Sequence, residues 1–171
     1  MEPVAEARAG TTGEAGGVGD VGDVAFAEVY AGEFEAVARL AFLLVRSRAV
    51  AEELAQDAFV RLFQRFATVE RPNGFLRTTV VRLALTWLER AEMERERLAR
   101  VGVDRPVDAP ELDETWEALG RLAPERRAVL VLRFYEGLRH GEVAELLGCP
   151  TATVRSRTRR ALADLRKELE R

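Results

Sequence analysis

Apolar side chains recur every three or four residues along most of this chain, and that spacing constrains the fold more than any other feature. A representative run is Phe34, Val37, Leu40, Ala41 and Leu44. This is the spacing of one face of an α-helix, whereas a half-buried strand alternates apolar and polar residues. We find no convincing strand alternation in the sequence. The sequence therefore predicts an all-α fold.

Two segments lack this period and divide the chain. Residues 1–23 are rich in glycine and have no large apolar side chain beyond Met1 and scattered valines. Such a segment cannot bury enough surface to offset its chain entropy, so we expect a disordered N-terminal tail. Residues 101–111 include two prolines and one glycine and are expected to form a flexible linker. Two small helical domains, at 24–100 and 112–171, are then predicted.

Turn signals divide each domain into helices. In the first domain the segment ERPNG, residues 70–74, predicts a break, because proline lacks a backbone donor and Asn-Gly favours a turn. The helices expected there start at Phe26, cover about 49–66 and cover 75–100. In the second domain Pro124 suits a first helical turn, while Gly137 and Gly148 suit helix ends. The helices expected there are about 112–120, 124–136, 140–147 and 151–169.

Basic side chains are concentrated near the C-terminus. The stretch CPTATVRSRTRRALADLRKEL, residues 149–169, has six basic side chains and one acid between Arg155 and Lys167, although the formal net charge of the chain is −3. A polyanion responds to the local charge of a surface more than to the net charge of the protein. The stretch therefore predicts a negatively charged ligand.

The residues before this stretch make it the second helix of a helix-turn-helix. The sequence RHGEVAELLGCPT reads as a short apolar-faced helix followed by a tight turn. The buried stripe expected on the second helix is Val154, Ala161, Leu162, Leu165 and Leu169. The face expected to be exposed is Ala152, Thr153, Ser156, Arg159, Arg160 and Lys167, flanked by Arg155 and Arg157. Small residues at its start would let this helix enter a major groove, where arginines reach phosphates or guanine edges.

At this point the sequence resembles a known family. The segment LAPERRAVLVLRFYEGLRHGEVAELLGCPTATVRSRTRRALADLR is similar to region four of bacterial sigma-70 family RNA polymerase sigma factors of the extracytoplasmic-function group. The segment AEELAQDAFVRLFQRF, residues 51–66, is similar to region two of the same family. The resemblance implies a protein that binds core RNA polymerase, directs promoter recognition and helps to open the duplex.

The resemblance also implies roles for particular residues. Region four would read the minus-thirty-five element through Arg155, Ser156, Arg157 and Arg160, with Arg159 on the same exposed face. Region two would contact the polymerase through Glu53, Gln56 and Asp57. The minus-ten element would be held beside the loop before the third helix, with Asn73, Phe75 and Arg82 as the candidates.

The third helix departs from the family pattern. Many relatives carry Asn at the position of Arg82 and several bases thereafter, whereas this chain continues as ERAEMERERLAR. Glu89, Glu92 and Glu96 lie at three- and four-residue spacing, so they share one face. Because acids that face phosphate are unfavourable, we expect promoter opening to be the weak step.

No pattern in the sequence predicts catalysis. His140 and Cys149 are the only histidine and the only cysteine, and no phosphate loop or metal-ligand cluster accompanies them. We therefore expect no enzyme, cofactor or metal, no membrane insertion, and a cytoplasmic location. The expected partners are core RNA polymerase and promoter DNA, with an anti-sigma factor as a further candidate. The alternatives are a helix-turn-helix regulator that acts without polymerase, and a sigma-like interaction module that has lost promoter melting.

Overall fold

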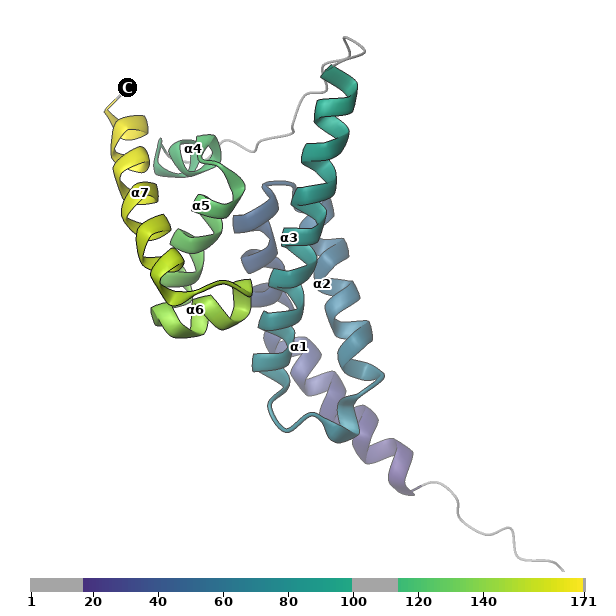
Figure 1. The fold of residues 1–171 in the computed structure, drawn as a ribbon. Helices are drawn as coiled ribbons and strands as arrows, with labels where there is room; N and C mark the ends of the chain where they lie inside the picture. The colour runs from purple at the N-terminus through teal and green to yellow at the C-terminus, as the bar shows by residue number, and fades with distance from the viewer. Residues whose placement is uncertain (1–16, 100–113, 171) are drawn as a thin grey trace, which may run out of the picture.

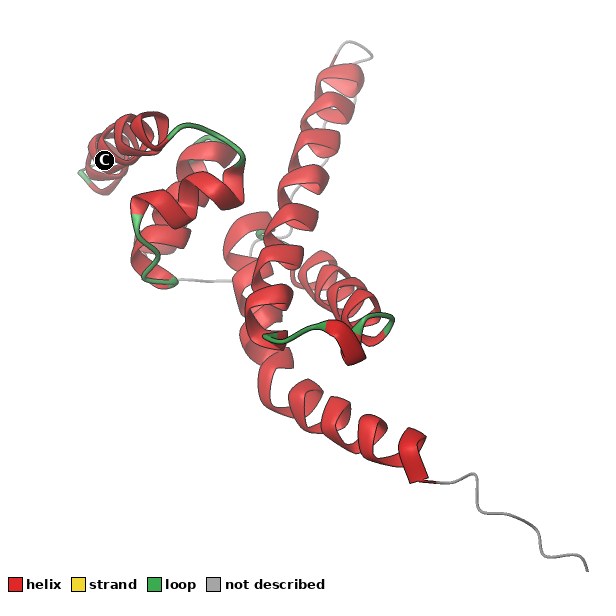
Figure 2. Cartoon of the chain, turned by 60° about the horizontal axis from the view of Figure 1, so that its bottom comes forward, coloured by secondary structure: helices red, strands yellow, loops and turns green. Residues whose placement is uncertain are grey.

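The protein is built from helices over the residues that the computed structural model describes, 17–99 and 114–170 (Figure 2). In chain order the elements are α1 (Gly17–Val45), α2 (Arg48–Phe63), η1 (Phe66–Thr68), α3 (Pro72–Ala99), α4 (Glu114–Arg121), α5 (Pro124–Leu130), η2 (Val131–Tyr135), α6 (His140–Leu147) and α7 (Thr151–Leu169). Of the two short elements, η1 is a 3-10 helix and η2 is a π-helical turn that continues α5. The all-α prediction is confirmed.

The first lobe consists of α1, α2 and α3, which pack against one another (Figure 1). The hydroxyl of Ser47 accepts a hydrogen bond from the backbone nitrogen of Val50 at 3.5 Å and so caps the start of α2. Buried side chains then recur at helical spacing along α2: Ala51, Leu54, Ala55, Ala58, Phe59 and Leu62. This stripe can be removed from water only against the stripes of α1 and α3, which explains the three-helix arrangement.

Arg46 ends α1 in an unusual backbone conformation. Its φ of 62° lies in the left-handed region, which costs a residue other than glycine about 1–2 kcal/mol. The backbone nitrogen of Arg46 donates to the carbonyl of Phe42 at 2.9 Å and closes the last turn of α1. The chain then reverses through Ser47 into α2, so a two-residue connection joins the two helices.

The break expected at residues 70–74 lies three residues earlier than predicted. Pro72 is the first residue of α3, and the backbone nitrogen of Phe75 already donates to the carbonyl of Arg71 at 3.0 Å. Proline is favoured in a first helical turn, because the nitrogen there needs no helical partner. Asn73 and Gly74 are therefore helical residues, and the connection from α2 passes through η1 instead.

The start of α1 also differs from the expectation. The tail was predicted to cover residues 1–23, but α1 already begins at Gly17. Once a helix is nucleated, each further residue adds a backbone hydrogen bond, so a helix can continue beyond its packed part. The rest of the predicted tail and the predicted linker at 101–111 lie outside the described residues.

The second lobe consists of α4 to α7, with α7 packed against α4, α5 and α6. Its buried stripe differs from the prediction, because Leu162 is 44% exposed and Leu169 is also exposed. Thr158 is buried in their place, and its hydroxyl donates to the carbonyl of Val154 at 2.8 Å. That internal bond satisfies the hydroxyl, so a polar residue fits where a larger apolar side chain was expected.

The buried stripe of α2 leads to a testable prediction about stability. Leu62 is fully buried, so Leu62→Ala leaves a cavity among α1, α2 and α3 and should lower the free energy of unfolding by about 2–5 kcal/mol. The matched control is Val60→Ala on the same helix, where the side chain is 55% exposed and the change should stay within about 0.5 kcal/mol. Urea denaturation followed by circular dichroism measures both, and equal losses would contradict this packing.

Candidate nucleic-acid interface

A tight turn joins α6 to α7 and sets the direction of the second helix. Gly148 has a φ of 62°, a left-handed conformation that glycine adopts without strain. The backbone nitrogen of Cys149 donates to the carbonyl of Ala144 at 3.0 Å, which satisfies an otherwise open helix end. Pro150 precedes α7, and its carbonyl accepts from the nitrogens of Thr153 and Val154 at 2.9 and 3.2 Å. The predicted helix-turn-helix is therefore present.

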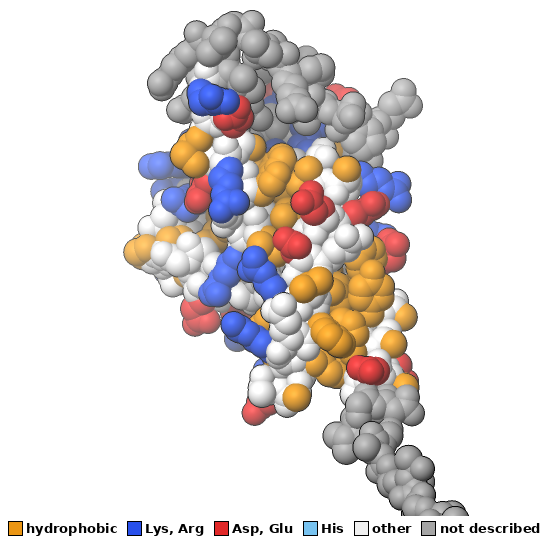
Figure 3. Space-filling model, turned by 90° about the vertical axis from the view of Figure 1, so that its right-hand side faces the viewer, with side chains coloured by type: hydrophobic (Ala, Val, Ile, Leu, Met, Phe, Trp, Pro, Cys, Tyr) orange, Lys and Arg blue, Asp and Glu red, His pale blue; other side chains and the backbone are white. Residues whose placement is uncertain are grey.

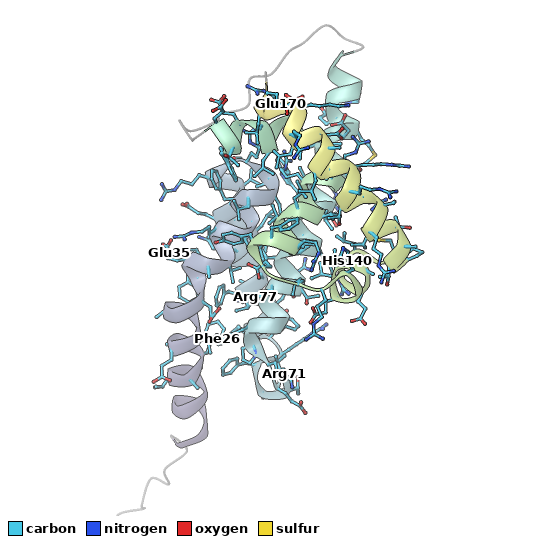
Figure 4. The ribbon with its side chains drawn as sticks, turned by 90° about the vertical axis from the view of Figure 1, so that its left-hand side faces the viewer. Phe26, Glu35, Arg71, Arg77, His140 and Glu170 are labelled. Carbon is cyan, nitrogen blue, oxygen red and sulfur yellow. The ribbon has the colours of Figure 1, made fainter. Side chains whose placement is uncertain are left out.

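The predicted DNA-contacting residues lie on the first half of α7. Arg155, Arg159 and Arg160 are exposed, while Arg157 and Ser156 are half-buried. The hydroxyl of Ser156 donates to the carbonyl of Thr153 at 3.1 Å, which leaves its oxygen available as an acceptor. Figure 4 shows long, nitrogen-tipped side chains projecting outward along α7. The helix thus presents a basic face, defined here as Arg155, Arg157, Arg159 and Arg160.

Acidic side chains of α7 pair within the second lobe and leave this basic face unneutralised. Asp164 forms an ion pair with Arg126 of α5, and Glu168 lies 3.8 Å from Arg121 of α4. Over the described residues, no acidic side chain forms an ion pair with the basic face. A polyanion that approaches the start of α7 therefore meets positive charge without internal competition.

The predicted polymerase-contacting residues share one exposed face of α2. Glu53, Gln56 and Asp57 are all exposed, and their three- and four-residue spacing places them side by side. The same face continues at Val60 and Phe63, which are 55% and 57% exposed. The result is an acidic surface that ends in two exposed apolar side chains, and one of them, Phe63, is a large aromatic group of the kind that can anchor a protein interface.

Phe63 belongs to an aromatic cluster that the sequence analysis missed. The cluster joins α1, α2 and η1 and comprises Phe26, Tyr30, Phe34, Phe59, Phe63 and Phe66, with ring centroids as close as 4.8 Å for Tyr30 and Phe59. Hydrophobic side chains gather on the face shown in Figure 3, toward the start of α1. The four-residue spacing of the three α1 aromatics is the signal that could have revealed it.

The three minus-ten candidates are not brought together on α3. Asn73 donates to a carboxylate oxygen of Glu33 at 2.7 Å and so ties α3 to α1. Phe75 is half-buried against the hydrophobic core, whereas Arg82 is exposed. At about 100° per residue, Asn73 and Arg82 project from opposite sides of the helix. A single contact surface on α3 cannot include all three side chains.

The charged end of α3 contains a salt bridge within the helix. Arg97 pairs with Glu94 at 2.8 Å, and this hydrogen bond lowers the pKa of Glu94 and raises that of Arg97. Glu89 and Glu92 are exposed earlier on the same helix, while the side chain of Glu96 lies outside the described residues. The acids at 89 and 92 therefore remain on the surface of α3.

The lone histidine and cysteine lie near the helix-turn-helix. His140 starts α6, and desolvation, followed by the charges of Arg133 and Arg155, lowers its pKa. Cys149 is half-buried in the turn. Histidine, cysteine and acidic side chains of the described residues nowhere gather in groups of three that could hold a metal ion. Within the same residues, no helix is both long enough and apolar enough to cross a membrane.

Two family models match the chain in the order of its two lobes. Sigma-70 region 2 matches residues 32–93, which lie in α1, α2 and α3. Sigma-70 region 4 matches residues 112–165, which include α4, α5, α6 and most of α7. The two matches together span more than half of the sequence, and each contains one of the two exposed faces described above.

Curated relatives agree with these matches. The probable RNA polymerase sigma factor RfaY of Xanthomonas campestris is 33% identical over 78% of this chain, which spans 37% of that protein. The RNA polymerase sigma-E factor of Streptomyces coelicolor is 31% identical, over 79% of this chain and 80% of that protein. The ECF RNA polymerase sigma factor SigE of Mycolicibacterium smegmatis is 32% identical, over 78% of this chain and 57% of that protein.

Solved structures share the fold. The sigma factor RpoE from Bartonella quintana, solved in complex with the anti-sigma factor NepR, matches with a TM-score of 0.66 at 22% identity, over 85% of this chain and 97% of that chain. CnrH, solved with the cytosolic domain of CnrY, matches with a TM-score of 0.57 at 25% identity, over 86% of this chain and 89% of that chain. From its two region matches and its curated relatives, this chain belongs to the sigma-70 family of RNA polymerase sigma factors, in the extracytoplasmic-function group.

Proposed function

We propose that this protein binds core RNA polymerase and directs it to promoters, where transcription begins. The observation that carries this proposal is the basic face of α7 within the region 4 match: Arg155, Arg159 and Arg160 are exposed, and no acid of the described residues forms an ion pair with the face. A region 2 match precedes it, with the exposed acidic face of α2. A regulator that acts without polymerase has no need of region 2, so that alternative is not favoured.

The basic face of α7 is proposed to read the minus-thirty-five element. Residues near the start of a recognition helix contact base edges, and arginine pairs with guanine through two parallel hydrogen bonds. Arg155, Arg159 and Arg160 are exposed enough to do so, while Arg157 and Ser156 are half-buried and suit phosphate or edge contacts. Backbone contacts would set the register of α7, and base contacts would set its sequence preference.

We predict that Arg155→Ala or Arg160→Ala weakens binding of the polymerase complex to the minus-thirty-five element by about 1–3 kcal/mol for each lost base contact. A lost phosphate contact would instead weaken binding to all sequences alike and reduce the salt slope by about one. Arg166→Ala, an exposed arginine near the end of α7, is the matched control. Footprints that remain unchanged in both variants would rule out this role for the basic face.

The exposed face of α2 is proposed to contact the polymerase. Glu53, Gln56 and Asp57 provide hydrogen-bond acceptors and negative charge, and Phe63 provides a large exposed aromatic surface at one end. Acidic groups at an interface steer encounter with a basic partner, while a buried aromatic ring contributes most of the affinity. The complementary surface on the polymerase is therefore expected to be basic, with an apolar pocket at one edge.

Charge reversal tests this contact. Glu53→Arg together with Asp57→Arg should weaken binding to core polymerase, because like charges opposed at an interface cost up to several kcal/mol. Helicity should not change, because both side chains are exposed. Glu35→Arg, an exposed acid on α1, is the matched control. If core polymerase is captured equally well by all three proteins, the assignment to α2 is wrong.

The minus-ten role is proposed for α3 through Asn73, Phe75 and Arg82. Extruding a base from a duplex costs a few kcal/mol, which stacking and hydrogen bonds must repay. Asn73 and Arg82 lie on opposite sides of α3, so the displaced strand would have to wrap around the helix to meet both. The exposed acids Glu89 and Glu92 lie further along α3 and oppose phosphate.

We therefore predict that promoter opening, rather than promoter binding, is the weak step. Glu89→Arg with Glu92→Arg should increase permanganate reactivity of thymines at the minus-ten element on a linear template, because the change removes repulsion between acid and phosphate. A template with the minus-ten element already unpaired is the control, and the variant should gain little on it. Strong opening by the unaltered protein, with no gain in the variant, would contradict this prediction.

The proposed function also includes a domain division and a location in the cell. We propose two domains, at residues 24–100 and 112–171, in a protein that acts in the cytoplasm and has no catalysis of its own.

An anti-sigma factor is a further proposed partner, since the RpoE and CnrH structures that share this fold contain NepR and the cytosolic domain of CnrY. The second candidate, an interaction module without promoter melting, is favoured only by the acids Glu89 and Glu92 on α3. Transcription with purified components separates the two.

A further inference from the structure

A hydrogen bond between Glu33 on α1 and Asn73 on α3 joins two helices of the first lobe. The side-chain nitrogen Nδ2 of Asn73 donates to the carboxylate oxygen Oε1 of Glu33 at 2.7 Å. Asn73 is exposed and Glu33 is half-buried, so the bond lies at the surface. Its net contribution to stability is modest, because water competes for both groups. Its main consequence is the orientation that it imposes on the Asn73 amide.

The carboxylate of Glu33 determines which way this amide points. An ionised carboxylate can only accept hydrogen bonds, whereas a primary amide has a nitrogen that donates and an oxygen that accepts. The nitrogen of Asn73 must therefore face Glu33, because a flipped amide would place two acceptors against each other. The Oδ1 oxygen of Asn73 has no hydrogen-bond partner among the described residues. Asn73 consequently presents this oxygen as an acceptor for a ligand.

The surface beside Asn73 has room for a base. Gly74 is exposed, and a Cβ atom built there would meet only the Cβ of Arg71, at 3.9 Å. Glycine in the first turn of α3 thus leaves open the space that a side chain would otherwise fill. Arg71 lies at the start of α3, is exposed and forms no ion pair with a described residue (Figure 4). Its guanidinium can contact the phosphate of a strand whose base lies at Asn73.

The acceptor of Asn73 suits only some bases. Cytosine and adenine carry an exocyclic amine that donates, at the position where thymine and guanine carry a carbonyl oxygen that accepts. An amine placed against Oδ1 forms a hydrogen bond, whereas a carbonyl placed there brings two acceptors together and leaves both unsatisfied. A good contact between a side chain and a base edge discriminates against the wrong base by roughly fivefold to a hundredfold.

We propose that Glu33 is a positioning residue that makes the minus-ten site select a base with an exocyclic amine, cytosine or adenine, over thymine or guanine. The proposal rests on the minus-ten role of Asn73 proposed above. Glu33 acts through the Asn73 amide, whose oxygen accepts from the amine of the displaced base. An acid near a phosphate backbone opposes binding, so this carboxylate weakens binding to every strand while it makes binding selective.

Base-substituted probes measure this selectivity. The complex of the full chain with core polymerase is titrated with single-stranded oligonucleotides that carry the minus-ten element, and fluorescence anisotropy gives the Kd. At each position cytosine is compared with uracil, and adenine with hypoxanthine, because each pair exchanges the amine for a carbonyl without changing a methyl group. At one position the wild-type complex should bind the amine-bearing base roughly tenfold more tightly. Equal affinities within both pairs at every position would overturn the proposal.

Glu33→Gln removes the constraint on Asn73 and keeps a hydrogen bond between α1 and α3. A glutamine amide can accept from Asn73 or donate to it, so Asn73 can present either its oxygen or its nitrogen to the base. The preference for an amine should be lost, because the carbonyl-bearing base now binds more tightly. Glu35→Gln, which removes the same charge from an exposed acid on α1, is the matched control and should keep the preference. A preference that survives in Glu33→Gln would rule out this role for Glu33.

An exchange of the two side chains distinguishes positioning from a purely structural contact. In Glu33→Gln with Asn73→Asp, the glutamine nitrogen donates to the aspartate, and the second aspartate oxygen remains an acceptor. The net charge equals that of the wild-type protein, so general repulsion of phosphate should change little. The preference for an amine should therefore return. If it does not return while circular dichroism shows an intact fold, the positioning role is wrong.

Run-off transcription with the same complexes separates a failure of this proposal from a failure of the proposed function. Transcription by the wild-type protein and by Glu33→Gln, with the same base preferences in both, overturns the role of Glu33 and leaves promoter recognition standing. No transcription by the wild-type protein, together with no binding to any minus-ten probe, overturns the proposed function and this proposal with it.

Discussion

Burial of the apolar stripe of α1 is the constraint on which the rest of the structure depends. Val37, Leu40, Ala41 and Leu44 are fully or almost fully buried, and α1 packs against α2 and α3 of its own lobe. The same helix also meets α5 and η2 of the second lobe. Since helices without a sheet can remove their stripes from water only against other helices, α1 determines where both lobes lie.

The acidic and basic side chains of α7 point in different directions. Asp164 and Glu168 are directed toward basic partners inside the second lobe, while the arginines of the basic face have no described acidic partner. The buried side of α7 uses Val154, Thr158 and Ala161, and the small volumes of these residues allow α5 and α6 to pack close. The packing residues and the basic face that is proposed to bind DNA therefore occupy different sides of a single helix, so that changes on the exposed side leave the packing intact.

Much of this arrangement could be predicted from the sequence, because it depends on local signals. Helical periodicity, Gly148 in the turn and the clustered arginines all act within a few residues, and each predicted feature is present. The sequence-based predictions were wrong where a helix boundary or the burial of a side chain depends on contacts with distant parts of the chain. Pro72 starts α3 instead of preceding it, and Thr158 is buried while Leu162 is exposed, because partners distant in the sequence decide which side of a helix is covered.

The hydrogen bond between Glu33 and Asn73 could not be predicted at all. The two residues lie on different helices, 40 positions apart in the chain, and no local pattern in the sequence joins them. Part of the candidate site could be predicted from the sequence, because it depends on a local pattern. The faces of α2 and α7 follow from helical spacing, whereas the separation of Asn73 and Arg82 became visible only once α3 was known to begin at Pro72.

Run-off transcription with purified core polymerase, with and without this protein, tests the central claim most directly. The account predicts transcripts with defined start sites only when both are present, and DNA protection upstream of those sites only in the joint complex. Equal protection of the same DNA by the protein alone, with no transcript when core polymerase is added, would contradict the account and favour a DNA-binding regulator.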